Sequence, residues 1–398
     1  MNFLKKIYCR TFQFCFKIAY PFLPYKEPVI LNSLKELCLN IKEHNYQNVL
    51  LITDKGIRCH GITKPLEEEL KNNDINCIVF DETVANPTTL NVSTAKDLYI
   101  KNQCQCLIAF GGGSAMDCTK AVGALIARPN KSLDKLKGLL KIRKKTPLIY
   151  AIPTTAGTGS EVTIASVITN EVTHHKYTLM DFNLIPSCAV LDPSVTYSLP
   201  KHLTATTGMD ALTHAIEAYI GKSNTKYTRK VAIDAIRLIL DNIEVAYNEP
   251  NNYEARKNML YASYLAGIAF TRSYVGYVHA IAHSLGGQYN LPHGLLNAII
   301  LPKVLKVYDK SIYKQIHKLC VMLNISKKND LKHDSFNKFI NKIIQLNHNL
   351  GIKDHIEEIN TNDILLMATH ADKEANPLYP VPKLMDKKEL MKIYRILK

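Results

Sequence analysis

The chain has 398 residues, which is enough for two domains with complete hydrophobic cores. Hydrophobic residues make up 46% and charged residues 21%, which excludes a disordered chain, and no apolar run approaches the length of a membrane-spanning helix. The net charge of +15 is spread along the sequence without an aromatic-plus-basic motif, so we expect no nucleic-acid binding. The ten cysteines form no Cys-x-x-Cys pair, which predicts reduced thiols and a cytoplasmic protein.

Residues 1–28 form an aromatic and basic extension that has five basic residues and no acid before Glu27. One interpretation is an amphipathic helix that brings residues 1–25 into contact with an anionic membrane surface. Another is a helix that ends at Pro21 and docks on the body of the protein itself, and we favour this second interpretation. An organelle transit peptide is a third option.

Residues 29–195 alternate short β-rich runs with helical patterns, which predicts a parallel sheet covered by helices. Five runs are expected to be strands, the last of them closing the series: NVLLITD (48–54), CIVFDE (77–82), CLIAFGGG (106–113), LIYAIPTT (148–155) and CAVLDP (188–193). Between them, LEEELKNN and STAKDLYIKN have helical composition and spacing. The basic run KGLLKIRKK (137–145) is expected to be a solvated loop.

Residues 196–398 have a different character, because long helical patterns dominate after Pro200. The expected helices include LTATTGMDALTHAIEAYI, TRKVAIDAIRLILDNIEVAYN, EARKNMLYASYLAGIAF and the segment that begins VHAIAH. We find no internal repeat and no low-complexity linker. The sequence therefore predicts an α/β nucleotide-binding domain followed by an all-α domain.

Three features of the α/β half point to a bound dinucleotide. AFGGGSAMD (109–117) follows a strand and opens a helix, so its glycines and free N–H groups suit a phosphate; a tight turn without a ligand is the alternative. IPTTAGTGSEVT (152–163) places hydroxyls and glycines after the next strand, where a pyrophosphate or a carboxamide can bind, or where a plain polar turn can form. Asp54 ends the first clear strand, where it can accept from a ribose diol and favour NAD over NADP, or simply cap a helix.

The helical half contains a carboxylate and four histidines in two short segments. Asp210 and His214 are four residues apart in GMDALTHAIEAY. VHAIAHSLGGQYNLPHG carries His279 and His283, also four apart, and His293 after a Gly-Gly break. Nitrogen and oxygen donors without a thiolate suit Fe²⁺ or Zn²⁺, whereas packed histidines are the alternative. Spacing does not decide which histidine is left over.

From about Pro28 to its end the sequence resembles the iron-containing (group III) alcohol dehydrogenases, within the dehydroquinate-synthase-like superfamily. Four motifs in the same order carry the resemblance: GGGSAMD, PTTAGTGSEVT, GMDALTHAIEAY and HAIAHSLGGQYNLPHG. The resemblance implies that Asp210, His214, His279 and His293 bind the metal and that His283 is free for proton transfer. It also implies nine cofactor-binding residues: Asp54, Asn86, Gly112, Gly113, Ser114, Thr154, Thr155, Thr158 and Lys176.

The resemblance implies an NAD-linked enzyme that uses Fe²⁺, with Zn²⁺ as an alternative, to interconvert a small primary alcohol or diol and its aldehyde. It also implies a homodimer. Two related activities are alternatives: a zinc-dependent polyol dehydrogenase of the glycerol type, and an NAD-using lyase of the dehydroquinate synthase type. A catalytically silent, membrane-associated binding protein is a third reading that only the N-terminal extension supports.

Overall fold

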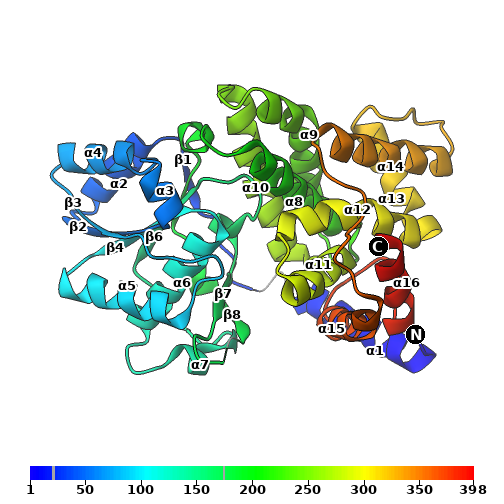
Figure 1. The fold of residues 1–398 in the computed structure, drawn as a ribbon, viewed down its shortest axis with the longest axis horizontal. Helices are drawn as coiled ribbons and strands as arrows, with labels where there is room; N and C mark the ends of the chain where they lie inside the picture. Colours follow the sequence, from blue (N-terminus) through cyan, green and yellow to red (C-terminus); the bar gives the residue numbers. More distant parts are fainter. Residues whose placement is uncertain (20–22, 174) are drawn as a thin grey trace. The chain divides into compact units, whose positions relative to one another are not determined.

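The computed structural model describes residues 1–398 except residues 20–22 and 174. The chain divides into two compact units (Figure 1). The first, Pro24–Leu199, is the α/β unit; the second combines Met1–Leu23 with Pro200–Lys398 and is called the helical unit here. Most of the N-terminal extension, Met1–Leu23, therefore clusters with the C-terminal half of the chain, and its last five residues belong to the α/β unit. No helix among the described residues has both the length and the apolar character needed to cross a membrane.

The α/β unit is built on a six-stranded sheet in the order β1-β9-β6-β4-β2-β3, in which every neighbouring pair is parallel. Its strands are β1 (Val29–Leu31), β2 (Asn48–Ile52), β3 (Asn76–Phe80), β4 (Cys106–Gly111), β6 (Leu148–Pro153) and β9 (Cys188–Val190). The five predicted strands are all present. Its helices are α2 (Leu34–Glu43), α3 (Lys55–Cys59), α4 (Lys64–Asn72), α5 (Thr89–Lys101), α6 (Gly113–Ala127) and α7 (Leu133–Leu136).

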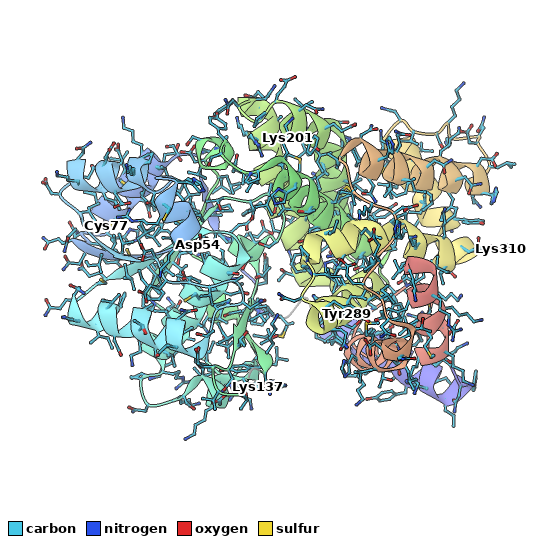
Figure 2. The ribbon with its side chains drawn as sticks, in the orientation of Figure 1. Asp54, Cys77, Lys137, Lys201, Tyr289 and Lys310 are labelled. Atoms are coloured by element: carbon cyan, nitrogen blue, oxygen red, sulfur yellow. The ribbon has the colours of Figure 1, made fainter. Side chains whose placement is uncertain are left out.

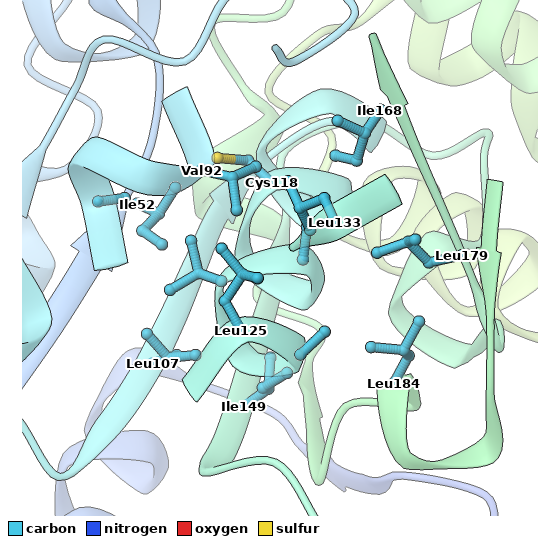
Figure 3. Packing of buried hydrophobic residues seen from close by; sticks show 14 of the residues in the cluster. Ile52, Val92, Leu107, Cys118, Leu125, Leu133, Ile149, Ile168, Leu179 and Leu184 are labelled. Carbon is cyan, nitrogen blue, oxygen red and sulfur yellow. The ribbon is translucent and has the colours of Figure 1, made fainter. Parts of the chain in front are cut away.

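Alternate residues of the central strands enter two separate cores, one on each face of the sheet. On one face, Leu50 and Ile52 pack with Leu107 and with Cys118 of α6 (Figure 3). On the other face, Val49 and Leu51 of the same strand belong to a core that α2 and α4 complete. Burial on both faces explains why these strands read as continuous apolar runs in the sequence.

Two parts of the α/β unit differ from the expectation. A sixth strand, β1, pairs with β9, although its three residues give too short a pattern to be recognised in the sequence. A second sheet has the order β5-β8-β7 and consists of β5 (Gly138–Leu139), β7 (Ala165–Thr169) and β8 (Lys176–Met180). The prediction of a solvated loop at 137–145 is right for its five basic residues, which are all exposed, but Gly138–Leu139 form β5 against β8 and Ile142 is buried.

The helical unit contains the predicted long helices. Its helices are α1 (Phe3–Ala19), α8 (Lys201–Ile220), α9 (Lys226–Asn248), α10 (Tyr253–Ser273), α11 (Tyr277–Tyr289), α12 (His293–Tyr308), α13 (Tyr313–Met322), α14 (Lys332–Asn349), α15 (Ile364–Ala375) and α16 (Lys387–Leu397). The expected Gly-Gly break is wrong, since Gly286 and Gly287 lie inside α11. That helix ends at Tyr289 and is followed by its C-cap residue Asn290, which adopts the left-handed conformation; Pro292 precedes the start of α12.

Helix α1 docks on the helical unit through polar contacts. Arg10 donates to the carbonyls of Val381 and Pro382, and the buried Gln13 amide donates to those of Pro377 and Tyr379. The N-terminal ammonium pairs with Asp386, the N-cap of α16. These contacts agree with the favoured docked helix, which ends at Ala19; the expected end at Pro21 lies outside the described residues.

Candidate functional site

Three side chains of the helical unit converge on one point. Asp210 lies in α8, His279 in α11 and His293 is the first residue of α12. One donor atom from each lies within 4.8 Å of the other two, the only such group found among the described residues that could hold a metal ion. The Asp210 Oδ1 atom is 3.7 Å from His279 Nε2 and 3.4 Å from His293 Nε2.

The close packing of α12 on α8 depends on Gly294. A Cβ atom at this position would collide with the Thr206 carbonyl of α8 and would also touch the Cβ of Asp210. The glycine therefore lets the first turn of α12 approach α8 closely enough for His293 to reach Asp210. Three helices can hold three ligands rigidly because each backbone is fixed by its own hydrogen bonds.

Glu217 orients one of these histidines. Its buried carboxylate accepts from His279 Nδ1 at 2.7 Å and from the backbone N–H groups of Gly276 and Val278 at 2.7 and 2.8 Å. The same side chain thus fixes the His279 ring and satisfies the N-terminus of α11. With Nδ1 donating to Glu217, the neutral ring has its lone pair on Nε2, which is the nitrogen available to a cation.

The other two histidines lie beside this group without entering it. His214 Nδ1 is 4.0 Å from Asp210 Oδ1, and its ring stacks between Phe270 and His279 at centroid distances of 4.1 and 4.4 Å. His283 stacks on His293 at 5.1 Å but directs Nδ1 to Glu374 Oε1, 2.7 Å away. Its side chain is 45% exposed, so His283 can exchange a proton with a ligand or water.

The donor set fits a divalent cation. Burial by itself would raise the pKa of Asp210, but the surrounding histidines hold that pKa well below its ordinary value, so the buried carboxylate stays ionised. A buried carboxylate with imidazole nitrogens at hand is a cation site of the oxygen and nitrogen type that Fe²⁺ and Zn²⁺ prefer. Asn297 Nδ2 lies within hydrogen-bond distance of all three of these ligand atoms, Asp210 Oδ1, His279 Nε2 and His293 Nε2.

In the α/β unit the predicted dinucleotide motifs lie at one edge of the sheet. Strands β2, β4 and β6 are neighbours, so Asp54, the GGGS turn and the TTAGT loop all follow parallel strand ends. Chain order reverses here, because β3 lies on one side of β2 and β4 on the other. Open α/β sheets bind ligands at such a switch point.

The glycine turn and the threonine loop face each other across this edge. A Cβ atom on Gly112 would lie 3.4 Å from Thr155 Oγ1, and one on Gly113 would lie 3.2 Å from Thr158 Cγ2. The Thr154 amide donates to the Gly111 carbonyl at 3.1 Å. Helix α6 begins at Gly113 and presents its N-terminal amides beside these hydroxyls, an arrangement that can bind a diphosphate.

The remaining predicted cofactor residues also gather here, with one qualification. The Asn86 amide donates to Ser114 Oγ at 3.4 Å, and Lys176 Nζ donates to Asn86 Oδ1 at 2.9 Å. Asp54, labelled in Figure 2, caps α3. Its Oδ1 accepts from the Ile57 amide at 2.9 Å. The helix-cap reading of Asp54 therefore holds, and only its second oxygen is left for a ribose.

Lys120 is a feature of this edge that the sequence analysis missed. Its side chain is completely buried, and Nζ lies 2.6–3.1 Å from five oxygens of Ser160, Thr163 and Ala165. The ammonium thus ties the end of the TTAGTGSEVT loop to α6. Burial lowers the pKa of Lys120 to about 8 and raises that of nearby Glu161 to about 7.

A sequence signal existed for Glu217 and none for Lys120. Asp210, His214 and Glu217 are spaced i, i+4 and i+7, so they share one face of α8. A lysine in a helix of mixed composition, by contrast, is normally exposed, and only the tertiary structure reveals that this one is not.

Comparisons with known proteins cover both units of the chain. The family model for the iron-containing alcohol dehydrogenase matches residues 30–193, and the C-terminal model of the Fe-containing alcohol dehydrogenase family matches residues 204–397. Alcohol dehydrogenase 4 of Saccharomyces cerevisiae is 35% identical over 347 residues, which cover 86% of this chain and 89% of that protein.

Solved structures are similar along nearly the whole chain. A 1,3-propanediol oxidoreductase is 33% identical with a TM-score of 0.89, and the match covers 94% of this chain and 99% of that one. Sulfoacetaldehyde reductase from Bifidobacterium kashiwanohense, solved with NAD⁺, is 27% identical with a TM-score of 0.84, covering 94% and 98%. The predicted fold class, an α/β unit and an all-α unit of the dehydroquinate-synthase-like type, is confirmed. The chain belongs to the iron-containing alcohol dehydrogenase family.

Proposed function

We propose that this chain is a metal-dependent, NAD(H)-linked oxidoreductase that interconverts a small primary alcohol or diol and its aldehyde. The convergence of Asp210, His279 and His293 on one point is the observation that carries the proposal. We assign His214 as the fourth ligand, because its ring adjoins Asp210 and His279. Zinc and iron both accept this donor set, and family membership favours iron.

When bound, the cation supplies Lewis acidity to the substrate oxygen and the nicotinamide supplies or accepts a hydride. The protein's own contribution to proton movement comes from His283. Its Nδ1–H donates to Glu374, which also accepts from the Tyr379 hydroxyl at 2.7 Å. Burial would raise the pKa of Glu374, but its interaction with His283 holds that pKa below the ordinary value. An ionised Glu374 stabilises the imidazolium that forms when Nε2 takes a proton.

The cofactor is assigned to the sheet edge of the α/β unit. The amides at the start of α6, with Ser114 and the hydroxyls of Thr154, Thr155 and Thr158, would hold the diphosphate and the carboxamide. Lys176 and Asn86, which contact each other, would hold further phosphate or ribose oxygens. We infer NAD rather than NADP, since the carboxylate of Asp54 repels a 2′-phosphate.

Net oxidation of NADH with a panel of short aldehydes, before and after chelation and with elemental analysis, tests this function. We expect turnover that disappears on chelation and returns with Fe²⁺ or Zn²⁺. A lyase of the dehydroquinate synthase type would instead show no net change in NADH. In the reverse assay with NAD⁺, a polyol dehydrogenase would oxidise glycerol in preference to simple alcohols, and a silent binding protein would show no turnover in either direction.

We further propose that residues 1–25 contact a membrane surface and that the enzyme is a cytoplasmic homodimer. The outward face of α1 is the specific observation that supports membrane contact. Of the seven large apolar side chains that are exposed on α1, all but Phe12 lie within an arc of about 140° at 100° per residue, opposite the buried Cys9 and Gln13. Those within the arc are Phe3, Leu4, Ile7, Tyr8, Phe14 and Ile18. Exposed Lys6 and Lys17 flank this face, and the absence of acids before Glu27 favours an anionic surface.

Flotation with vesicles of mixed neutral and anionic phospholipid tests this contact against vesicles of neutral lipid alone. We expect binding to the anionic vesicles that the double variant Leu4→Ser/Phe14→Ser abolishes. A matched variant, Tyr253→Ser/Leu331→Ser, removes exposed apolar side chains at the starts of α10 and α14 and should bind as the unaltered protein does. Light scattering measures the oligomeric state in the same samples.

A further inference from the structure

The side chain of Asn297 occupies an unusual position in the helical unit. It lies one turn after His293 in α12 and is fully buried. Its Nδ2 atom is 2.6 Å from Asp210 Oδ1, 3.0 Å from His293 Nε2 and 3.2 Å from His279 Nε2. Its Oδ1 atom, equally buried, has no hydrogen-bond partner among the described residues. The amide nitrogen therefore has hydrogen-bond partners for both of its hydrogens, whereas the amide oxygen has none among the described residues.

The three atoms that face Nδ2 are the same three that converge as metal donors. Asp210 Oδ1 is a carboxylate acceptor, and with Nδ1 donating to Glu217 the neutral His279 ring has its lone pair on Nε2. An amide nitrogen has two hydrogens, which these three acceptors must share. A cation would use the same lone pairs, so the amide hydrogens and a cation cannot be bound there together.

We propose that Asn297 is a positioning residue that holds the three donor atoms together by hydrogen bonds and competes with the cation for them. Buried acceptors left without a donor would be costly, and a neutral amide meets that need without adding charge. The amide thereby keeps the site assembled and also weakens cation binding, because the cation must displace it. This inference rests on the proposed metal centre.

The experiment compares Asn297→Ala with Asn347→Ala in the full-length protein. Asn347 is a matched control in α14: it is 6% exposed, its amide donates to the Ala298 carbonyl at 2.7 Å, and its Oδ1 also lacks a partner among the described residues. Thermal unfolding is measured after chelation and again with Zn²⁺ alone added. The Zn²⁺ dissociation constant is measured by competition with a chelator of known affinity.

We expect Asn297→Ala to lower the unfolding midpoint of the chelated protein more than that of the Zn²⁺-loaded protein. Zn²⁺ affinity should rise about 10- to 100-fold, the equivalent of the hydrogen bonds to charged partners that the cation no longer has to break. Asn347→Ala should lower both midpoints equally and leave the affinity unchanged. Asn297→Asp is a second variant in case the alanine variant does not fold. It replaces the amide hydrogen-bond donor by a carboxylate acceptor, so Zn²⁺ should raise its unfolding midpoint more than that of Asn297→Ala.

Equal shifts for Asn297→Ala and Asn347→Ala would overturn the inference, because Asn297 would then serve packing alone. Weaker Zn²⁺ binding by Asn297→Ala would overturn it too, since the amide would then support the loaded site. If the unaltered protein shows no Zn²⁺-dependent shift, or if Asp210→Ala retains the shift, the proposed metal centre itself fails, and that result is distinct from the other two.

Discussion

The proposed metal centre (Asp210, His279 and His293) and the proposed cofactor site at the sheet edge of the α/β unit, called the cofactor edge here, stabilise buried polar groups in different ways. At the proposed metal centre, the candidate ligands stand on the three helices α8, α11 and α12, and the polar side chains of Glu217 and Asn297 hydrogen-bond to them directly. At the cofactor edge, the candidate residues lie mostly in the loops after β4 and β6. The buried ammonium of Lys120 donates to backbone carbonyls of the segment that follows β6 and so fixes that loop. Rigid helices need only fine adjustment of side chains, whereas a loop needs a group that fixes its backbone.

If the metal centre depends on one free histidine, His283→Ala should have the largest effect on catalysis. We expect the metal content to be unchanged and turnover to fall about 10²- to 10⁴-fold, the usual contribution of a general acid or base. Elemental analysis together with turnover measured against pH checks this. His370→Ala, which removes an exposed histidine of α15, serves as the control. Loss of metal in His283→Ala would instead make this residue a ligand.

If the loop at the cofactor edge is held by the buried Lys120 ammonium, Lys120→Met should destabilise the protein strongly. Five oxygens would lose their donor, and we expect a loss of about 3–5 kcal/mol in the free energy of unfolding, as when one partner of a buried charged group is removed. Urea unfolding measures this, and the KM for NADH should rise in the folded fraction. Lys101→Met, an exposed lysine of α5, should change stability by less than about 0.5 kcal/mol. A small effect at Lys120 would mean that the loop is held by its other contacts.

Glu217→Gln tests whether the orientation of His279 matters as much as its presence. The amide cannot accept from His279 and from two backbone N–H groups as a carboxylate does, so the ring loses its fixed orientation. We expect metal affinity to fall about 10- to 100-fold. Chelator competition with Zn²⁺ gives the affinity directly. An unchanged dissociation constant would show that helix packing alone positions the ring.

The smallest expected effect concerns pH and the cofactor edge. Burial raises the pKa of Glu161 from 4.5 to about 7, so between these values the folded protein holds a proton that the unfolded chain releases. The free energy of unfolding therefore falls as pH rises through this range. The full shift would correspond to ~1.4 kcal/mol per unit of pKa. Because Glu161 is coupled to Lys120, we expect a smaller fall of about 1–2 kcal/mol. Glu161→Gln should remove that share of the pH dependence. Unfolding curves at pH 5 and pH 7 compare the two proteins, and a parallel pH dependence would contradict this reading.

Much of the fold could be predicted because the strong patterns were local. Strands buried on both faces, such as β2 and β4, read as apolar runs, and long helices such as α8 show their spacing over several turns. The three-residue β1 and the two-residue β5 carry no such pattern. They are strands only because β9 and β8 lie beside them to provide hydrogen-bond partners. The continuation of α11 through Gly286 and Gly287 also depends on residues outside that segment. The packing of α11 on α12 and α15 outweighs the weak helix propensity of glycine.

The sequence by itself determined the types of residue at both sites: one carboxylate and four histidines in the helical half, and glycines with hydroxyls after strands in the α/β half. The tertiary structure decided which of them meet. It brought Asp210, His279 and His293 together, placed His283 against Glu374, and buried Lys120 and Asn297 among oxygen and nitrogen acceptors. The physical reason is that residue chemistry is encoded position by position, whereas the satisfaction of a buried polar group depends on side chains that are distant in the chain.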